Sequence, residues 1–254
     1  MILSQSKIKY LRSLEQKKNR LKEKKIVLDG RRLIDEAINQ NVNIEHIWIS
    51  KNQKDENDFM KKIESNNINC SFEKEKIIKK ISNTKNSQGI IALISIDKMY
   101  NYTLDKFDDR IAILDQISDP GNLGTIIRTC AWFGVDSIIL TDNSVDIFNY
   151  KCVRSSMGGH FHIKNLNYLS YDEINRFLEQ NSFHVLCADM NGSSLNQVKV
   201  SKKWALILGS EAYGVSEKLN FSSKICIPQI GKIESLNASV AFGILLNDLI
   251  KKGT

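Results

Sequence analysis

The stretch IAILDQISDPGNLGTIIRTCAWFGVDSIILT, residues 111–141, decides the fold because it has the pattern of a strand, a helix and a second strand. Its ends, residues 111–115 and 137–141, are short apolar runs typical of strands. Between them, residues 122–133 place apolar side chains at helical spacing. A strand, a helix and a strand in this order predict two parallel strands in one sheet.

Further apolar runs extend this sheet toward the end of the chain. We expect strands at residues 184–188, 204–209 and 224–228, followed by a closing helix at 236–252. Each strand ends in a loop that contains Gly, Asn or Asp. Ligands of open parallel sheets bind at the carboxyl ends of the strands, so the chemistry is expected in these loops.

A smaller α/β domain is expected before this sheet. Only Gly30 and Gly89 precede residue 110, whereas eleven of the thirteen glycines and both prolines follow it. We expect an N-terminal domain over 1–97, a polar linker over 98–109 and a second domain over 110–254. The elements predicted in the first domain are helices at 4–24, 31–40, 55–66 and 74–82 and strands at 25–30, 44–50, around 70–72 and 89–96.

Positive charge is concentrated at the start of the chain. Residues 1–32 hold eleven Lys or Arg and three Asp or Glu, a balance of +8 within a net charge of +7. Such a segment suits a phosphate backbone, because each neutralised phosphate releases counterions. The alternative is a solvated helix face that binds nothing.

The overall composition is that of a globular protein, with 42% hydrophobic and 26% charged residues. No apolar run approaches the roughly 18 residues of a membrane span, and the N-terminus lacks the apolar core of a secretory signal. A cytoplasmic protein is therefore expected. His160 and His162 would share a face of a strand, but no further ligands accompany them, so no metal site is expected.

The loop after residue 115 carries polar side chains at the expected ligand edge. Pro120 and Gly121 predict a tight turn, and Asn122 follows at the helix start. Arg128 lies on the helix face opposite the apolar side, as a surface arginine or as a guanidinium directed at an anionic or hydroxyl-bearing substrate. The loop has neither a phosphate-binding Gly-Lys-Ser/Thr nor the Gly-x-Gly-x-x-Gly of a nicotinamide dehydrogenase.

Two later loops add hydrogen-bonding groups. In LILGSEAYGVS, residues 206–216, Glu211 follows a fully apolar strand and needs a cation or several donors, with Arg128 a candidate partner. In IPQIGKIESLN, residues 227–237, Ser235 and Asn237 lie beside the start of the closing helix. A helix that presents its first turn to a ligand uses such groups.

Together the three loops resemble the signature motifs of the SpoU/TrmH family of RNA 2′-O-ribose methyltransferases, in the SPOUT superfamily. The first motif, Asn-x-Gly-x-x-x-Arg, matches Asn122, Gly124 and Arg128. The second, Gly-x-Glu-x-x-Gly, matches Gly209, Glu211 and Gly214. The third matches Ile227, Pro228, Gly231, Glu234, Ser235, Leu236 and Asn237. This resemblance covers roughly residues 110–252.

The first domain resembles, more weakly, the RNA-binding domain that many family members carry. The similar stretches are VLDGRRLIDEAI, residues 27–38, and SNTKNSQGIIAL, residues 82–93. Two positions depart from the family pattern: Ala212 stands where glycine is common, and Gly159-His160 stands where a small and a bulky residue are frequent.

The resemblance implies a parallel sheet whose last strand, loop and helix form a deep trefoil knot. Pro228 and Gly231 would make the tight, stiff corners of the threaded chain. The implied cofactor is S-adenosylmethionine. The residues carried over for its binding are Leu208, Gly209, Ala188, Ile227, Pro228, Gly231 and Leu236.

The resemblance also implies a reaction. A ribose 2′-hydroxyl would attack the methyl group of the cofactor, with Arg128 as activator, either as a base or through its charge. Asn122, Ser235 and Asn237 would orient the ribose and the arginine, and Glu211 would anchor them. No metal is required, and a homodimer is expected, with the arginine reaching a shared site.

The separate N-terminal domain favours structured ribosomal RNA over tRNA as the substrate. The alternative from another class is a non-catalytic RNA-binding protein that retained the fold. The presence of Asn122, Arg128 and Glu211 argues against this alternative.

Overall fold

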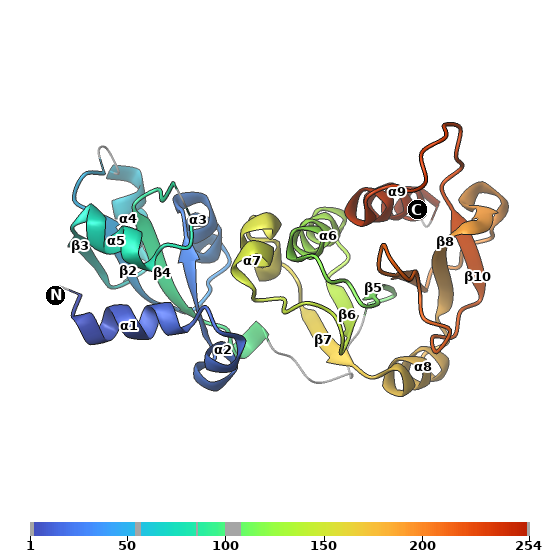
Figure 1. Cartoon of the computed structure of the whole chain (residues 1–254), viewed down its shortest axis with the longest axis horizontal. Helices are drawn as coiled ribbons and strands as arrows, with labels where there is room; N and C mark the ends of the chain where they lie inside the picture. The colour runs from blue at the N-terminus through green and yellow to red at the C-terminus, as the bar shows by residue number, and fades with distance from the viewer. Residues whose placement is uncertain (1–2, 54–56, 85, 100–107, 253–254) are drawn as a thin grey trace.

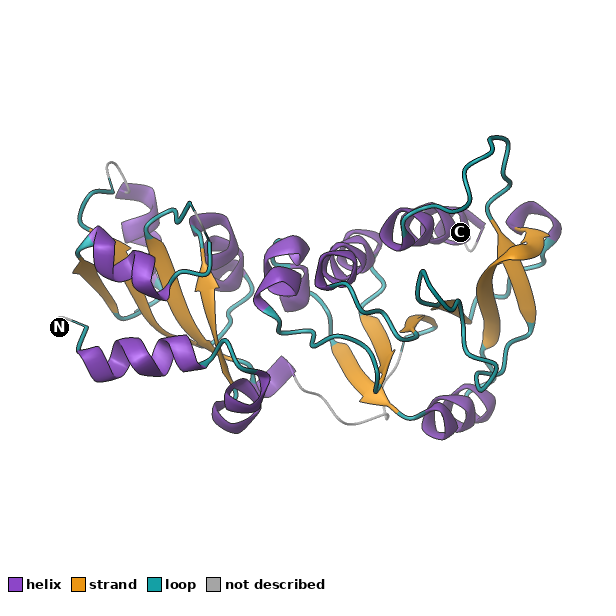
Figure 2. Cartoon of the chain, viewed as in Figure 1, coloured by secondary structure: helices purple, strands orange, loops and turns teal. Residues whose placement is uncertain are grey.

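The computed structural model describes residues 3–53, 57–84, 86–99 and 108–252, which form two α/β units, each around its own sheet (Figures 1 and 2). We refer to residues 3–99 as the N-terminal domain and to residues 108–252 as the C-terminal domain. Most of the predicted linker, residues 100–107, lies outside the described residues.

The N-terminal domain contains a mixed four-stranded sheet in the order β1-β4-β2-β3. β4 is antiparallel to both β1 and β2, and β3 is parallel to β2. The strands are β1 Lys25–Asp29, β2 Ile44–Ser50, β3 Cys70–Glu73 and β4 Ile90–Ser95. The helices are α1 Gln5–Ser13, α2 Lys17–Glu23, α3 Arg31–Asn39, α4 Asn57–Ser65 and α5 Glu75–Ile81, and the short 3-10 helix η1 Asp97–Met99 follows β4.

The single helix predicted over residues 4–24 is wrong, because α1 and α2 are separate helices. α1 begins after Ser4, whose hydroxyl accepts a hydrogen bond from the Lys7 amide, and it ends at Ser13. The break leaves the carbonyl groups of Leu14 and Glu15 without helical partners, and the Arg20 guanidinium donates hydrogen bonds to both.

The C-terminal domain contains a six-stranded, all-parallel sheet in the order β10-β8-β9-β5-β6-β7, as expected from the strand–helix–strand pattern. Its strands are β5 Arg110–Leu114, β6 Ser137–Thr141, β7 Asn165–Leu169, β8 His184–Ser194, β9 Trp204–Leu208 and β10 Ser223–Cys226. Its helices are α6 Pro120–Phe133, α7 Tyr150–Ser156, α8 Tyr171–Gln180 and α9 Ala238–Lys252, with the 3-10 helices η2 Gly159–Phe161 and η3 Leu195–Gln197.

Helix α6 begins earlier than the sequence suggests. Asp119 caps it by accepting a hydrogen bond from the Asn122 amide at 2.7 Å, and Pro120 occupies the first turn, where no amide hydrogen is needed. Pro120 and Gly121 therefore belong to the helix and do not form the predicted turn before it. The helix ends at Gly134, which has a left-handed backbone with φ of 69°. α6 and α9 pack side by side, and α7 lies between α6 and the N-terminal domain (Figure 1).

Candidate functional site

The carboxyl ends of β5 and β9, which are neighbours in the sheet, border a cleft of about 270 Å³. The loop after β5, the loop after β9 and the start of α9 all contribute to it. Its lining residues are Gln116, Ile117, Ser118, Asp119, Asn122, Asn143, Ser210, Glu211, Ala212, Tyr213 and Ala238. The cleft therefore lies at the sheet edge where the sequence placed the chemistry.

Glu211 joins the three predicted motifs into one cluster. Its Oε1 accepts hydrogen bonds from Asn122 Nδ2 at 3.0 Å and from the Ala238 amide at 3.1 Å, with Asn237 Nδ2 at 3.4 Å. Asn237 Nδ2 also donates to Asn122 Oδ1 at 2.9 Å. The structure thus brings together three of the five predicted catalytic residues.

Asn237 also fixes the start of α9. Its Oδ1 accepts hydrogen bonds from the backbone amides of Ser239 at 3.0 Å and Val240 at 3.3 Å, which is the geometry of an N-cap. Glu211 lies at the same helix end, where a negative charge is favoured by the helix dipole. The sequence predicted that the first turn of this helix presents hydrogen-bonding groups to a ligand. In the structure, its Ala238 amide binds the Glu211 carboxylate.

Of the two kinds of partner considered for Glu211, a cation such as Arg128 or several donors, the structure shows the donors. Within the described part of the chain, the contacts of the Glu211 carboxylate are amide donors. Arg128 lies on the exposed face of α6, beside Thr125, Thr129 and Trp132, of which Trp132 is 83% exposed. Arg128 lies six residues after Asn122 in α6, so the two side chains do not share a face of the helix. Ser235 is also exposed, outside the hydrogen bonds that hold the cluster.

The predicted cofactor residues lie in three neighbouring strands or in the loops that follow them. Ala188 lies in β8, Leu208 ends β9, and Ile227 follows β10 directly, in the part of the sheet where these strands adjoin. Leu208 and Gly209 are buried, and Ala188 and Ile227 are half-buried. Pro228, Gly231 and Leu236 lie in the exposed loop that leads to α9.

Two of the motif glycines, Gly209 and Gly231, differ in whether the structure has room for a side chain. At Gly209, an added Cβ would lie 2.1 Å from the Gly214 carbonyl group, so only glycine permits this close turn. At Gly231, an added Cβ would meet nothing within 4 Å. The close backbone approach expected at Gly231 is therefore absent from this structure, whereas Gly209 provides one.

Asp115 is a site residue that sequence reasoning missed. Its carboxylate is fully buried, and it accepts hydrogen bonds from the Thr141 and Tyr171 hydroxyls at 3.0 and 3.1 Å and from the Ser216 amide at 2.7 Å. It thereby ties the loop after β9 to β5 and β6. The available signal was a carboxylate at the end of an apolar strand, the same signal that identified Glu211.

The two histidines do not lie on a strand and make separate contacts. His160, in η2, is buried; its Nε2 donates to the Ile147 carbonyl at 2.7 Å, and its Nδ1 lies 2.7 Å from the Ser156 hydroxyl. Burial lowers the pKa of His160 to about 4, so the ring is neutral near pH 7. His162 instead contacts Glu36 of the N-terminal domain at 2.8 Å.

Among the described residues, no group of three or more His, Cys, Asp or Glu side chains is arranged to hold a metal ion. In the same part of the chain, none of the helices combines the length and the apolar character that crossing a bilayer would require.

Comparison with known proteins defines the class to which this fold and site belong. The SpoU rRNA methylase family matches residues 109–247, and the MRM3-like substrate binding domain matches residues 5–92. The chain is 32% identical over 249 residues to the 23S rRNA (guanosine(2553)-2′-O)-methyltransferase RlmP of Bacillus subtilis, covering 96% of this chain and 95% of that protein. The chain therefore belongs to the SpoU rRNA methylase family.

Solved structures agree with this assignment. An AdoMet-bound rRNA methyltransferase from Sinorhizobium meliloti has a TM-score of 0.85 and 26% identity, over 99% of this chain and 97% of that one. The methyltransferase AviRb from Streptomyces viridochromogenes, in complex with AdoMet, shares the fold with a TM-score of 0.87 at 17% identity, over 98% of each chain. The predicted family is therefore confirmed. The enzyme class and the cofactor predicted from the sequence are those of the named members of this family.

Proposed function

We propose that this protein transfers a methyl group from S-adenosylmethionine to a ribose 2′-hydroxyl of structured RNA, and that its substrate is ribosomal RNA. The observation that carries the proposal is the junction of Asn122, Glu211 and Asn237 beside the cleft, since all three family motifs contribute to it. Two observations support ribosomal RNA: the match of the N-terminal domain to a substrate binding domain, and the 23S rRNA named in the description of RlmP.

These strands and the loops after them fit the proposed cofactor. Ala188 in β8 and Ile227 directly after β10 present half-buried apolar surface, and Leu236 presents exposed apolar surface in the loop that follows β10. Such surface suits an adenine ring, while the backbone around Gly209 supplies close polar groups. When bound, S-adenosylmethionine supplies an electrophilic methyl group on a sulfonium that leaves as a neutral thioether.

The residues of the chain would then prepare the nucleophile. The 2′-hydroxyl of the substrate would accept the methyl group, and its proton would pass to solvent. A guanidinium keeps its proton near neutral pH, so Arg128 would act by stabilising the developing negative charge on the 2′-oxygen. Asn122, Asn237 and Ser235 would orient the ribose, and Glu211 would hold both amides in place.

The exposed position of Arg128 is consistent with a site shared between two subunits. On the adjacent helices α6 and α9, Trp132 is 83% exposed, Val240 50% and Ile244 38%. Such a concentration of apolar surface is typical of an interface. We propose that this face forms a homodimer in which Arg128 reaches the site of the partner. We also propose the trefoil knot of the family for the segment from β9 to α9.

The decisive experiment follows tritium from labelled S-adenosylmethionine into unmodified transcripts of 23S ribosomal RNA and, separately, of tRNA. The expected result is label in the ribosomal transcript at a nucleotide whose 3′ linkage becomes resistant to alkali, because a methylated 2′-oxygen cannot attack it. Tight binding of RNA without transfer would support the non-catalytic alternative, and label on a base would exclude ribose methylation.

A further inference from the structure

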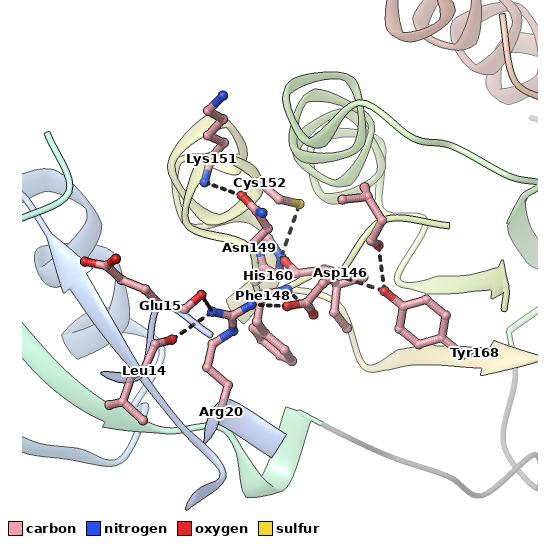
Figure 3. A network of polar contacts seen from close by, with 12 residues as sticks. Leu14, Glu15, Arg20, Asp146, Phe148, Asn149, Lys151, Cys152, His160 and Tyr168 are labelled. Carbon is pink, nitrogen blue, oxygen red and sulfur yellow. Dashed lines mark hydrogen bonds and ion pairs between the residues drawn. The ribbon is translucent and has the colours of Figure 1, made fainter. Parts of the chain in front are cut away.

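A buried ion pair joins the two domains (Figure 3). Arg20 belongs to α2 of the N-terminal domain and is 5% exposed; Asp146 belongs to the loop after β6 of the C-terminal domain and is 8% exposed. The guanidinium also donates hydrogen bonds to the carbonyls of Leu14 at 2.7 Å and Glu15 at 2.5 Å. Arg20 was part of the basic segment expected to contact RNA, so that expectation is wrong for this residue.

The loop that carries Asp146 is held in one conformation from the other side. Asp146 accepts a hydrogen bond from the Phe148 amide at 3.1 Å. The Tyr168 hydroxyl donates to the Val145 carbonyl at 2.7 Å and accepts from the Ile147 amide at 3.0 Å. The carboxylate that meets Arg20 is therefore presented by a rigid segment of the C-terminal domain.

The same loop borders the candidate site. Asn143 lines the cleft, and the Val145 amide donates to the Ile117 carbonyl in the loop after β5 at 2.8 Å. Only two residues, Ser144 and Val145, separate Asn143 at the cleft from Asp146 at the ion pair. A displacement of the N-terminal domain that breaks the ion pair thus acts on a segment in direct contact with the cleft.

Other contacts make the junction more than one bond. Glu36 Oε1 of α3 lies 2.8 Å from His162 Nε2. The Glu36 side chain also packs closely on Gly158, where an added Cβ would lie only 2.5 Å from Glu36 Cγ. Phe148 and Val153 belong to the same continuous apolar cluster as Leu28 of the N-terminal sheet. Domains that share little apolar surface usually move relative to each other, whereas these two share a core.

We infer that Arg20 is a positioning residue, which with Asp146 locks the N-terminal domain at a fixed distance and angle from the cleft. Removing two charges from water is costly, so the pair is favourable only where its geometry is satisfied, and it therefore specifies one arrangement. The inference rests on the proposed function in one respect: with the domains fixed in one arrangement, a single RNA molecule would contact both domains in one defined position.

The test compares two acid-to-amide substitutions that each remove the carboxylate of an ion pair. Asp146→Asn removes the interdomain pair, and Glu45→Gln removes the pair of Glu45 with Lys25 inside the N-terminal domain. Full-length proteins are measured by small-angle X-ray scattering, by calorimetric titration with S-adenosylmethionine and by steady-state methylation of an unmodified 23S ribosomal RNA transcript.

For Asp146→Asn we expect a larger radius of gyration and a KM for RNA raised about tenfold, the effect typical of a lost buried contact, with kcat and cofactor affinity within about threefold of the parent. Glu45→Gln should leave all four quantities unchanged. Arg20→Lys should give an intermediate KM, because an ammonium keeps the charge but not the forked geometry. Arg20→Met combined with Asp146→Asn should be no worse than either alone.

Two results would overturn the lock. One is an Asp146→Asn protein whose scattering and KM equal those of Glu45→Gln. The other is a parallel loss of kcat, KM and cofactor affinity, which would assign Asp146 to the folding of the C-terminal domain. If the parent protein methylates no RNA, the proposed function fails, and the scattering comparison still decides whether the ion pair fixes the domains.

Discussion

At the residue scale, the candidate site depends on two carboxylates that follow neighbouring buried strands. Asp115 and Glu211 are both satisfied by amide and hydroxyl donors rather than by a cation. Donors from different segments can hold a carboxylate as well as an ion pair does, and they fix the positions of those segments. This arrangement leaves the guanidinium of Arg128 available for substrate.

The first prediction concerns that guanidinium. Arg128→Ala should reduce methyl transfer by about a hundredfold or more, as expected for the loss of one charge-stabilising group. Its affinity for S-adenosylmethionine should stay close to the parent value, because Arg128 lies on α6 and the proposed cofactor residues lie in β8, in or directly after β9, and after β10. Calorimetry and tritium transfer measure the two quantities.

The matched control is Arg176→Ala, which removes an exposed arginine from α8, outside the cleft lining. It should retain full activity. Turnover of Arg128→Ala within a few-fold of the parent would remove Arg128 from the mechanism.

The second prediction concerns His160. Its folded-state pKa of about 4 lies below the ordinary 6.5, because burial disfavours the charged ring. As the pH falls from about 6.5 to about 4, His160 therefore becomes protonated in the unfolded chain but stays neutral in the folded chain. Over this range, the residue should lower the free energy of unfolding by up to about 1.4 kcal/mol per pH unit.

Urea unfolding of the parent and of His160→Gln at several pH values tests this prediction. The variant is expected to be less stable near pH 7, because the contact with the Ile147 carbonyl changes, but to lose less stability on acidification. Equal slopes for the two proteins would show that His160 titrates normally.

The residues of the site were partly predictable. The sequence indicated that Asn122, Glu211 and Asn237 would meet, because each lies next to the carboxyl end of a strand or at a helix start. The spacing also places Arg128 and Asn122 on different faces of α6, which disfavours a pair between Arg128 and Glu211. Which face of α6 meets the loop after β9 depends on the rotation of α6 about its axis, which its packing against α7 and α9 determines.

At the element scale, the crossing of α6 and α7 depends on one glycine. A Cβ on Gly124 would lie 2.3 Å from the Cys152 carbonyl oxygen and 2.6 Å from Ser155 Cβ. The first-motif glycine therefore serves close helix packing and acts on the site only through the position of α6. Because α7 also contacts the N-terminal domain, this crossing links the site to the domain junction.

The third prediction follows from this crossing. Gly124→Ala should destabilise the protein by about 1–3 kcal/mol, because backbone atoms of α7 must move to admit a methyl group. Gly243→Ala is the matched control, since its Cβ would meet only Thr129 Cγ2 at an ordinary 3.8 Å. In the middle of α9, it should stabilise by up to about 1 kcal/mol. Chemical denaturation distinguishes the two, and equal stabilities would contradict the packing argument.

Most helices and strands were predictable from periodicity, and α7 and β7 were not. α7 spans only seven residues, and β7 carries buried Asn165 and Asn167, which interrupt the apolar pattern of a strand. α8 was not predicted either, although its sequence carries helix signals: Ser170 and Glu173 form a capping box, and Ile174, Phe177 and Leu178 are buried at helical spacing. Short elements are specified by tertiary packing more than by local pattern, so the sequence alone indicates them weakly.

At the scale of the whole molecule, positive charge and domain docking use the same N-terminal segment. Of its basic residues, Arg20 is buried against Asp146, and Lys25 pairs with Glu45. Lys18 and Lys22 of α2 are exposed and suited to contact phosphates. A simple charge count could not separate these roles, because it does not show which side chains face the other domain.

The last prediction uses this separation. Replacing Lys18 and Lys22 by Gln should weaken RNA binding and flatten its salt dependence. The reason is that RNA binding releases fewer counterions when the protein makes fewer phosphate contacts. Two lost contacts should reduce the slope of log affinity against log salt by about 1.4 to 1.8 units. The matched control replaces Lys199 and Lys202, two exposed lysines of the C-terminal domain, by Gln, and changes the net charge equally. Binding of an unmodified 23S ribosomal RNA transcript across a salt series measures both slopes, and equal slopes would show that α2 presents only a solvated face.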